Sequence, residues 1–126
     1  MWVLCDREPV RNWSRGRATL LGDAAHPMLQ YLAQGACMAM EDAVCLAHCV
    51  EKFDSLEEAF VRYQSQRYLR TTRVQLTARI YGDIYHAADA TADLRKLMLS
   101  GRDPAGAYQG MKWLYDGVDE HGIQVM

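Results

Sequence analysis

Hydrophobic residues follow two different patterns along the chain, and the change between them comes near residue 35. Before it, the four-residue apolar runs Trp2–Cys5 and Ala18–Leu21 are separated by a polar stretch that contains Pro9 and Gly16. Short apolar runs bounded by turn-forming residues are typical of strands, so both runs are predicted to be strands. Two such strands do not make a stable sheet by themselves, and their partners are expected to lie elsewhere or to be missing.

From Gly35 the apolar residues recur at helical spacing almost to the end of the chain. The sequence Ser55-Leu56-Glu57-Glu58 has the form of a capping box, in which the serine hydroxyl accepts a hydrogen bond from the amide three residues later. Asp103-Pro104 has the form of another helix start. These signals predict four helices: one beginning at Gly35, one from Leu56 to about Tyr85, one capped by Asp89 or Thr91 and running through Leu99, and one from Pro104 to about Tyr115.

The first of these helices carries apolar residues on most of its circumference. One stripe recurs at intervals of three and four residues: Ala36, Met40, Ala43, Ala47 and Val50. The other side is also largely apolar, with three polar exceptions: Glu41, Asp42 and His48. A helix that is apolar on most sides is typically buried, so burial is predicted for this helix.

Composition narrows the class of protein. The chain has 126 residues, of which 50% are hydrophobic and 24% charged, and this is typical of one globular domain. A net charge of −2 gives no electrostatic reason to expect nucleic acid as a partner. No apolar stretch approaches the 20 or so residues of a membrane span, so no membrane association is expected.

The cysteines indicate a reducing environment. Cys5, Cys37, Cys45 and Cys49 form no CxxC pair. Cys45 and Cys49 share a helical face, but no second pair of ligands accompanies them, and no metal site is predicted. Small buried thiols are the expected state, and the protein is predicted to be cytoplasmic.

The junction between the second predicted strand and the first predicted helix holds the most distinctive chemistry. The strand ends in Gly22-Asp23, which places a carboxylate at the carboxyl edge of a sheet, where it can accept hydrogen bonds from sugar or ribityl hydroxyls. The helix begins with the free amides of Gly35, Ala36 and Cys37, which favour an anion or an electron-rich carbonyl.

A proline loop lies between these two features. Pro27 fixes φ and stiffens the loop, and Gln30 can orient a polar group of a substrate. Each residue also has an ordinary interpretation: Asp23 as a turn residue or helix cap, Gly35 as a turn glycine, and His26 as a surface loop residue. Only the combination indicates a ligand site.

This combination resembles a known motif. The run GRATLLGDAAHP, followed by AQGACMAMEDAVCLA, resembles the second flavin-binding motif of the single-component FAD-dependent aromatic hydroxylases, the class A flavoprotein monooxygenases. The resemblance implies FAD as cofactor, with Asp23 at its ribityl side, Pro27 against the isoalloxazine ring and the QGA amides at the pyrimidine edge. The residues it assigns to FAD binding are Gly22, Asp23, Pro27, Gln34, Gly35, Ala36 and Cys37.

The resemblance also indicates a substrate. The stretches CDREPVRNWSRGR, HPMLQYLAQGACMAMEDA and YHAADATADLRKLMLSGR are most similar to hydroxylases that convert 3-hydroxybenzoate to gentisate with NADH and oxygen. Salicylate 1-hydroxylases are the alternative. By this resemblance Gln30 lies in the substrate pocket and assists hydroxylation, so Gln30 is the predicted catalytic residue. The implied partners are a small aromatic acid, O2 and NADH, with a homodimer as an open possibility for the parent enzyme.

The implied fold is α/β in the parent, with a Rossmann-like FAD-binding fold, whereas this chain is mostly α, two short strands followed by four helices. Residues 1–54 are predicted to be the last part of the FAD-binding domain, and residues 55–126 a helical region packed on it.

The sequence has no GxGxxG motif for the ADP part of FAD. The chain is therefore expected to be a C-terminal fragment that is inactive alone and binds FAD weakly or not at all. A non-catalytic helical interaction module, or a remnant without function, is the alternative. An interaction module has no need of the residues of the strand-to-helix junction.

Overall fold

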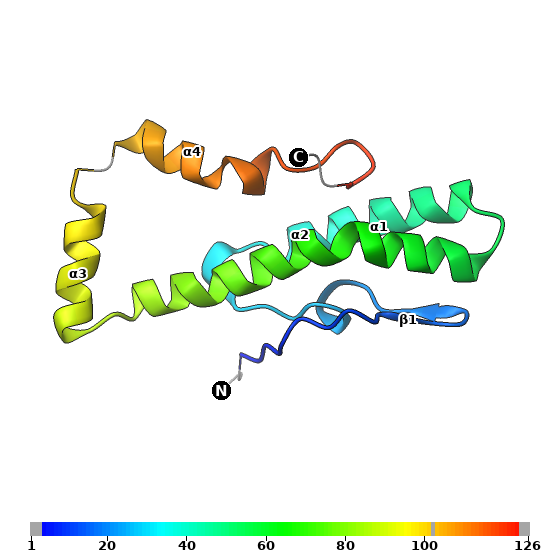
Figure 1. The fold of residues 1–126 in the computed structure, drawn as a ribbon, viewed down its shortest axis with the longest axis horizontal. Helices are drawn as coiled ribbons and strands as arrows, with labels where there is room; N and C mark the ends of the chain where they lie inside the picture. The colour runs from blue at the N-terminus through cyan, green and yellow to red at the C-terminus, as the bar shows by residue number, and fades with distance from the viewer. Residues whose placement is uncertain (1–3, 102, 124–126) are drawn as a thin grey trace.

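Two long helices packed side by side form the centre of the structure, a computed structural model that describes residues 4–101 and 103–123. They are α1 (Gly35–Lys52) and α2 (Leu56–Tyr85), and a short turn joins them so that they run in opposite directions (Figure 1). The N-terminal segment lies along one side of the pair, while α3 (Asp89–Leu99) and α4 (Pro104–Tyr115) continue from the far end of α2.

The N-terminal segment contains a small hairpin. β1 (Ser14–Arg15) and β2 (Ala18–Thr19) pair antiparallel, and Gly16 has the positive φ, 54°, that such a tight turn requires. The predicted content of two short strands and four helices is confirmed. The first strand among the described residues, however, lies at Ser14–Arg15, because the turn at Gly16 pairs residues that are close in sequence. Residues 4 and 5 are not in a strand, and residues 2 and 3 lie outside the described residues.

The helix boundaries follow the capping residues. The Ser55 hydroxyl accepts a hydrogen bond from the Glu58 amide at 3.1 Å, and α2 begins at the next residue as predicted. The Asp103 side chain caps α4 in the same way. α3 begins at Asp89 without a side-chain cap, so the predicted cap by Asp89 or Thr91 is wrong.

α1 turns its acidic side toward α2. The residues that it buries are Met38, Asp42, Cys45 and Cys49. The apolar stripe that begins at Ala36 faces outward and leaves 62% of Met40 and 41% of Val50 exposed. The predicted burial of this stripe is therefore wrong for the described structure. The reason is electrostatic, since α2 presents the buried guanidinium groups of Arg67 and Arg70 to the acidic residues of α1.

The core lies between the helix pair, the N-terminal segment and α4. One cluster packs the helix pair against the N-terminal segment: Trp13, Ala25, Cys45, Cys49, Ala59 and Tyr63. A smaller one lies where α4 returns to the pair: Met38, Val74 and Leu114. The predicted domain division at residue 54 runs between two helices that share this core, and it stays a prediction.

Two 3-10 turns connect the hairpin to α1 and carry the predicted site residues. They are η1 (Gly22–Ala24) and η2 (Gln30–Leu32). η1 packs against α1, whereas η2 packs against α2. Within residues 4–101 and 103–123, none of the helices combines the length and apolar character that crossing a membrane requires.

Candidate functional site

Gly22 brings the η1 turn into contact with α1. Its φ is 59°, which glycine adopts without strain, and a Cβ at this position would lie 3.2 Å from the Ala39 Cβ. Its amide donates a hydrogen bond to the Asp42 Oδ2 at 3.0 Å. Gly22, predicted to bind cofactor, therefore has a clear packing role: it lets the turn lie directly on the helix.

Asp23 projects from this turn toward the start of α1. A Cβ at Gly35 would lie 3.8 Å from the Asp23 Oδ1. The carboxylate and the glycine that opens the helix are therefore close together in the structure. Asp23 is exposed. Within the described residues no hydrogen bond or ion pair engages its carboxylate, which leaves both oxygens available as acceptors.

The start of α1 has free amide donors. Gln34 occupies the cap position, but no side chain caps the helix. The first backbone bond of the helix runs from the Met38 amide to the Gln34 carbonyl at 2.9 Å. Helix geometry therefore leaves the amides of Gly35, Ala36 and Cys37 without intrahelical acceptors. Together with the helix dipole, these donors form a site for an electron-rich oxygen beside the Asp23 carboxylate.

The loop that contains Pro27 is held by side chains from outside it. Gln75 of α2 donates from Nε2 to the carbonyls of Pro27 and Arg7, each at 2.8 Å. The Arg7 guanidinium donates in turn to the carbonyls of Ala24 at 2.6 Å and Ala25 at 2.8 Å. The loop is thus fixed at both η1 and Pro27, as a rigid wall of a binding site requires.

Gln30 opens η2 and is exposed. Its neighbour Tyr31 packs against Gly82 of α2, where a Cβ would lie 2.6 Å from the tyrosine ring. The Tyr31 hydroxyl and the His86 Nε2 are hydrogen-bonded at 2.9 Å. Gly82 of α2 therefore makes room for Tyr31, the residue next to Gln30.

His26 and Asp42 were missed as parts of the site. The His26 side chain is 2% exposed, so its interpretation as a surface loop residue is wrong. Its Nε2 lies 2.6 Å from the Asp42 Oδ2, and its ring lies 5.5 Å from the Trp13 ring. A sequence signal existed: an aspartate on an apolar helix face needs a buried partner. The sequence did not identify which residue supplies it.

Asp42 is the most enclosed charge of the site. Its Oδ1 accepts a hydrogen bond from the Arg67 Nε at 2.7 Å, and both side chains are fully buried. Burial by itself raises the pKa of the Asp42 carboxyl, but the hydrogen bonds and charges of His26 and Arg67 outweigh it and lower that pKa. The group is therefore a carboxylate at neutral pH, with donors on both oxygens.

The cysteines near this network do not have the properties of nucleophiles. Cys45 and Cys49 are buried and donate to the Gln66 Oε1 at 3.3 and 3.2 Å. Burial and the neighbouring Cys49 raise the pKa of Cys45 to about 12, so its thiol stays protonated at neutral pH. In the described part of the chain, no three His, Cys, Asp or Glu side chains are grouped so that they could hold a metal ion.

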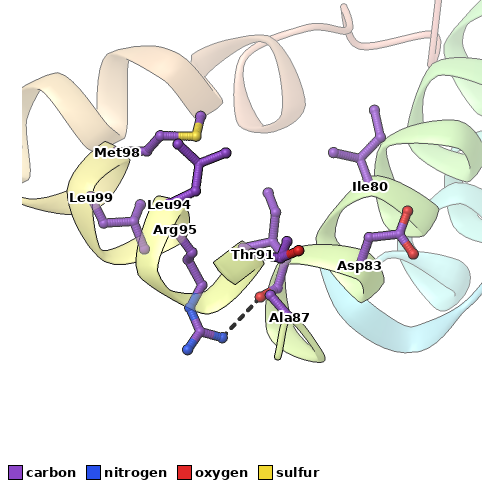
Figure 2. A pocket seen from close by; sticks show the side chains of 9 residues that line it. Ile80, Asp83, Ala87, Thr91, Leu94, Arg95, Met98 and Leu99 are labelled. Carbon is purple, nitrogen blue, oxygen red and sulfur yellow. Dashed lines mark hydrogen bonds between the residues drawn. The ribbon is translucent and has the colours of Figure 1, made fainter. Parts of the chain in front are cut away.

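An apolar hollow lies at the other end of α2 and shares no residue with the 22–37 segment. It has a volume of about 210 Å³, and Figure 2 shows Leu94 and Met98 of α3 across it from Ile80 of α2. Arg95 at its rim is already engaged, since it donates to the Ile84 carbonyl at 3.0 Å. The hollow is lined mainly by apolar side chains and is separate from the η1–α1 junction.

Comparisons with known proteins identify the family of the chain. The family model described as "FAD binding domain" matches residues 5–77. The chain is 50% identical over 115 residues to 3-hydroxybenzoate 6-hydroxylase 1 of Aquipseudomonas alcaligenes, which covers 90% of this chain and 29% of that protein. It is 43% identical over 124 residues to the 3-hydroxybenzoate 6-hydroxylase of Klebsiella oxytoca, which covers 98% of this chain and 31% of that protein. The chain thus spans less than a third of the length of these relatives.

A solved structure shares the fold. The crystal structure of Klebsiella pneumoniae HpxO complexed with FAD and uric acid superposes with a TM-score of 0.78 and 34% sequence identity. The superposition covers 84% of this chain and 28% of that one. The fold of most of this chain is therefore shared with one part of a larger protein that was solved with FAD bound.

Proposed function

Because the chain belongs to the family of FAD-binding domains, we propose that residues 22–37 hold the ribityl chain and ring of FAD in an aromatic hydroxylase. The observation that carries this proposal is the pairing of the unengaged Asp23 carboxylate with the uncapped start of α1 at Gly35. One group accepts hydrogen bonds and the other donates them. Ribityl hydroxyls and the carbonyls of a flavin ring need this pair of partners.

Each residue of the segment has a defined role in this proposal. Asp23 accepts hydrogen bonds from ribityl hydroxyls, and Pro27 forms a stiff wall beside the ring. The amides of Gly35, Ala36 and Cys37 donate to the pyrimidine edge, where negative charge collects on reduction. Bound FAD supplies the electron transfer from NADH to oxygen that hydroxylation of an aromatic ring requires.

The proposed substrate is a phenolic aromatic acid, with 3-hydroxybenzoate as the first candidate and gentisate as its product. The support is the identity of 43% to 50% to the two named 3-hydroxybenzoate 6-hydroxylases. Gln30, exposed at the start of η2, is proposed to contact the substrate. A hydroxylase of the salicylate 1-hydroxylase kind is the alternative within the same family.

The other partners are proposed from the same relatives. NADH and O2 are the proposed co-substrates, and the cytoplasm is the proposed location. A homodimer of the longer enzyme is proposed on the exposed apolar side chains of α3, since Leu94, Leu97 and Met98 are each more than half exposed.

A hybrid enzyme tests the proposed function. The segment of the Aquipseudomonas enzyme that matches this chain is replaced by residues of this chain, and the hybrid is purified without added flavin. We expect FAD to co-purify and 3-hydroxybenzoate to stimulate NADH oxidation. A folded hybrid without flavin, as judged by circular dichroism and gel filtration, contradicts the cofactor proposal. Flavin without any response to 3-hydroxybenzoate or salicylate contradicts the substrate proposal.

Gln30 is tested in the same hybrid. Gln30→Ala is expected to lower the fraction of NADH oxidation that yields hydroxylated product. The matched control is Gln109→Ala, because Gln109 is exposed on α4, far along the chain from the site. Equal product yields from the two variants would remove the role assigned to Gln30.

A further inference from the structure

One buried carboxylate holds both ends of the turn that carries Asp23. The Asp42 Oδ2 accepts a hydrogen bond from the Gly22 amide at 3.0 Å and lies 2.6 Å from the His26 Nε2. Gly22 directly precedes Asp23, and His26 directly precedes Pro27. Asp23 and Pro27, which are both proposed to meet the flavin, are therefore each next to a residue anchored on Asp42.

The same side chain belongs to the helix that supplies the amide donors. Asp42 lies seven residues after Gly35, about two turns further along α1. A rigid helix fixes the distance between Asp42 and its own first turn. Anchoring the η1 turn on Asp42 therefore fixes that turn relative to the amides at the start of α1.

The anchor itself is held in place. Arg67 of α2 donates from Nε to the Asp42 Oδ1 at 2.7 Å and from Nη1 to the Gly122 carbonyl at 2.8 Å. The Nδ1 of His26 is buried and has no hydrogen-bond partner among the described residues, so the bond to Asp42 is the polar anchor of that ring. Because Asp42 is a carboxylate, the proton of the pair lies on the His26 Nε2.

We infer that Asp42 is a positioning residue of the flavin site: it sets the Asp23 carboxylate at its place beside the first amides of α1 without touching the cofactor. This inference rests on the proposed function for the identity of the ligand. The geometry that it concerns belongs to the chain itself and can be measured without flavin.

Asparagine at position 42 disturbs this geometry with little change in shape. An asparagine has one acceptor oxygen and one NH2 donor, whereas Asp42 receives donors on both oxygens. The NH2 group of the asparagine must therefore face another donor, either the Arg67 guanidinium or the pair formed by the Gly22 amide and His26.

Glu41 offers a matched control on the same helix. It pairs with Arg67 at 2.8 Å and with Arg70 at 2.8 Å, so it belongs to the same ion network. It makes no hydrogen bond to the η1 turn within the described residues. Glu41→Gln removes one charge from the network and leaves the anchor of the turn intact.

The test is an NMR measurement on the 126-residue chain. In the wild-type background, Asp23→Asn is expected to change the chemical shift of the Gly35 amide, because the Asp23 carboxylate lies beside the start of α1. Asp42→Asn is expected to abolish this effect of Asp23→Asn and to speed hydrogen exchange of the Gly22 amide about tenfold relative to amides in the middle of α2, as loss of one buried hydrogen bond implies. Glu41→Gln is expected to keep the effect and the relative exchange rate.

Equal behaviour of Asp42→Asn and Glu41→Gln in both measurements would overturn the inference. If Asp42→Asn does not fold, His26→Leu decides the question, because leucine has no donor for Asp42 and releases only the Pro27 end of the turn. Exchange must then rise at the amides of residues 26 and 28 and stay unchanged at Gly22. Uniform exchange rates along the turn overturn the inference.

Failure of the proposed function can be distinguished from failure of this inference. A folded hybrid enzyme that binds no flavin would contradict the proposed ligand, whereas the NMR result on the position of Asp23 would still hold.

Discussion

At the scale of single residues, two features make the proposed site. Asp23 and Gly35 are twelve positions apart in sequence and adjacent in space, since Gly22 allows the turn to lie on α1. The sequence pattern predicted a carboxylate and free amides at the two ends of one loop, and the structure places these groups near each other. It could not show the buried partners Asp42 and His26, because such pairing depends on which helix face turns inward.

Gly22 tests the close approach of the turn. Gly22→Ala adds a strained φ and a methyl group 3.2 Å from the Ala39 Cβ. Gly16→Ala adds the strained φ alone, since nothing lies within 4 Å of its Cβ position. We expect Gly16→Ala to cost about 1–2 kcal/mol, and Gly22→Ala to cost a further ~1–3 kcal/mol from overpacking. Urea unfolding measures both, and equal losses would contradict the packing role of Gly22.

Asp42 gives the chain an acid-sensitive contribution to stability. Its pKa is lowered in the folded state, so this contribution is complete above the unfolded pKa of about 3.9 and is lost as the pH falls through the lower, folded pKa. Unfolding free energies between pH 6 and pH 2 check this. Asp42→Asn should reduce the loss of unfolding free energy between pH 6 and pH 2. Asp54→Asn, at an exposed aspartate, should leave that loss unchanged. Equal losses of unfolding free energy in the wild type and both variants would show that Asp42 does not make this contribution.

At the scale of elements, local signals predicted the helices better than the strands. Ser55 and Asp103 cap α2 and α4 where the sequence indicates, because capping is decided within four residues. The first strand was misplaced, since strand pairing depends on partners. The inward face of α1 was also mispredicted, because both of its faces are apolar and only the arginines of α2 decide between them.

The two faces of α1 differ in chemical reactivity. Met38 is fully buried and Met40, two residues later, is 62% exposed. Mild peroxide treatment of the folded chain should oxidise Met40 well before Met38, because oxidation follows exposure. Fragment-ion mass spectrometry of the peptide that contains both resolves them. Faster oxidation of Met38 would mean that the helix face is assigned wrongly.

Substitutions at two helical glycines distinguish the effect of helix propensity on stability from the effect of packing. Gly110 of α4 has open space at its Cβ position, whereas a Cβ at Gly82 of α2 would lie 2.6 Å from the Tyr31 ring. Gly110→Ala should stabilise the protein by about 0.5–1 kcal/mol. Gly82→Ala should destabilise it by about 1–3 kcal/mol because the ring must move. Thermal unfolding checks both, and stabilisation by both substitutions would disprove the contact with Tyr31.

At the scale of the whole molecule, the chain is a mostly helical part of an α/β parent fold. It spans 29% of the Aquipseudomonas relative, and it leaves apolar surface exposed on the outer face of α1 and on α3. Its own residues supply the proposed contacts to the ribityl chain and ring. We therefore expect these residues to bind FAD when this chain forms part of a complete FAD-binding fold.

The affinity of the hybrid enzyme for FAD tests this claim most directly. Flavin is removed, and FAD is titrated back by fluorescence quenching into the hybrid, its Asp23→Asn variant and its Asp54→Asn variant. We expect Asp23→Asn to weaken FAD binding about tenfold or more, because charge-assisted hydrogen bonds are lost. The Asp54→Asn hybrid should bind FAD like the unmodified hybrid. Equal affinities of the Asp23→Asn and Asp54→Asn hybrids would show that Asp23 does not contact the cofactor.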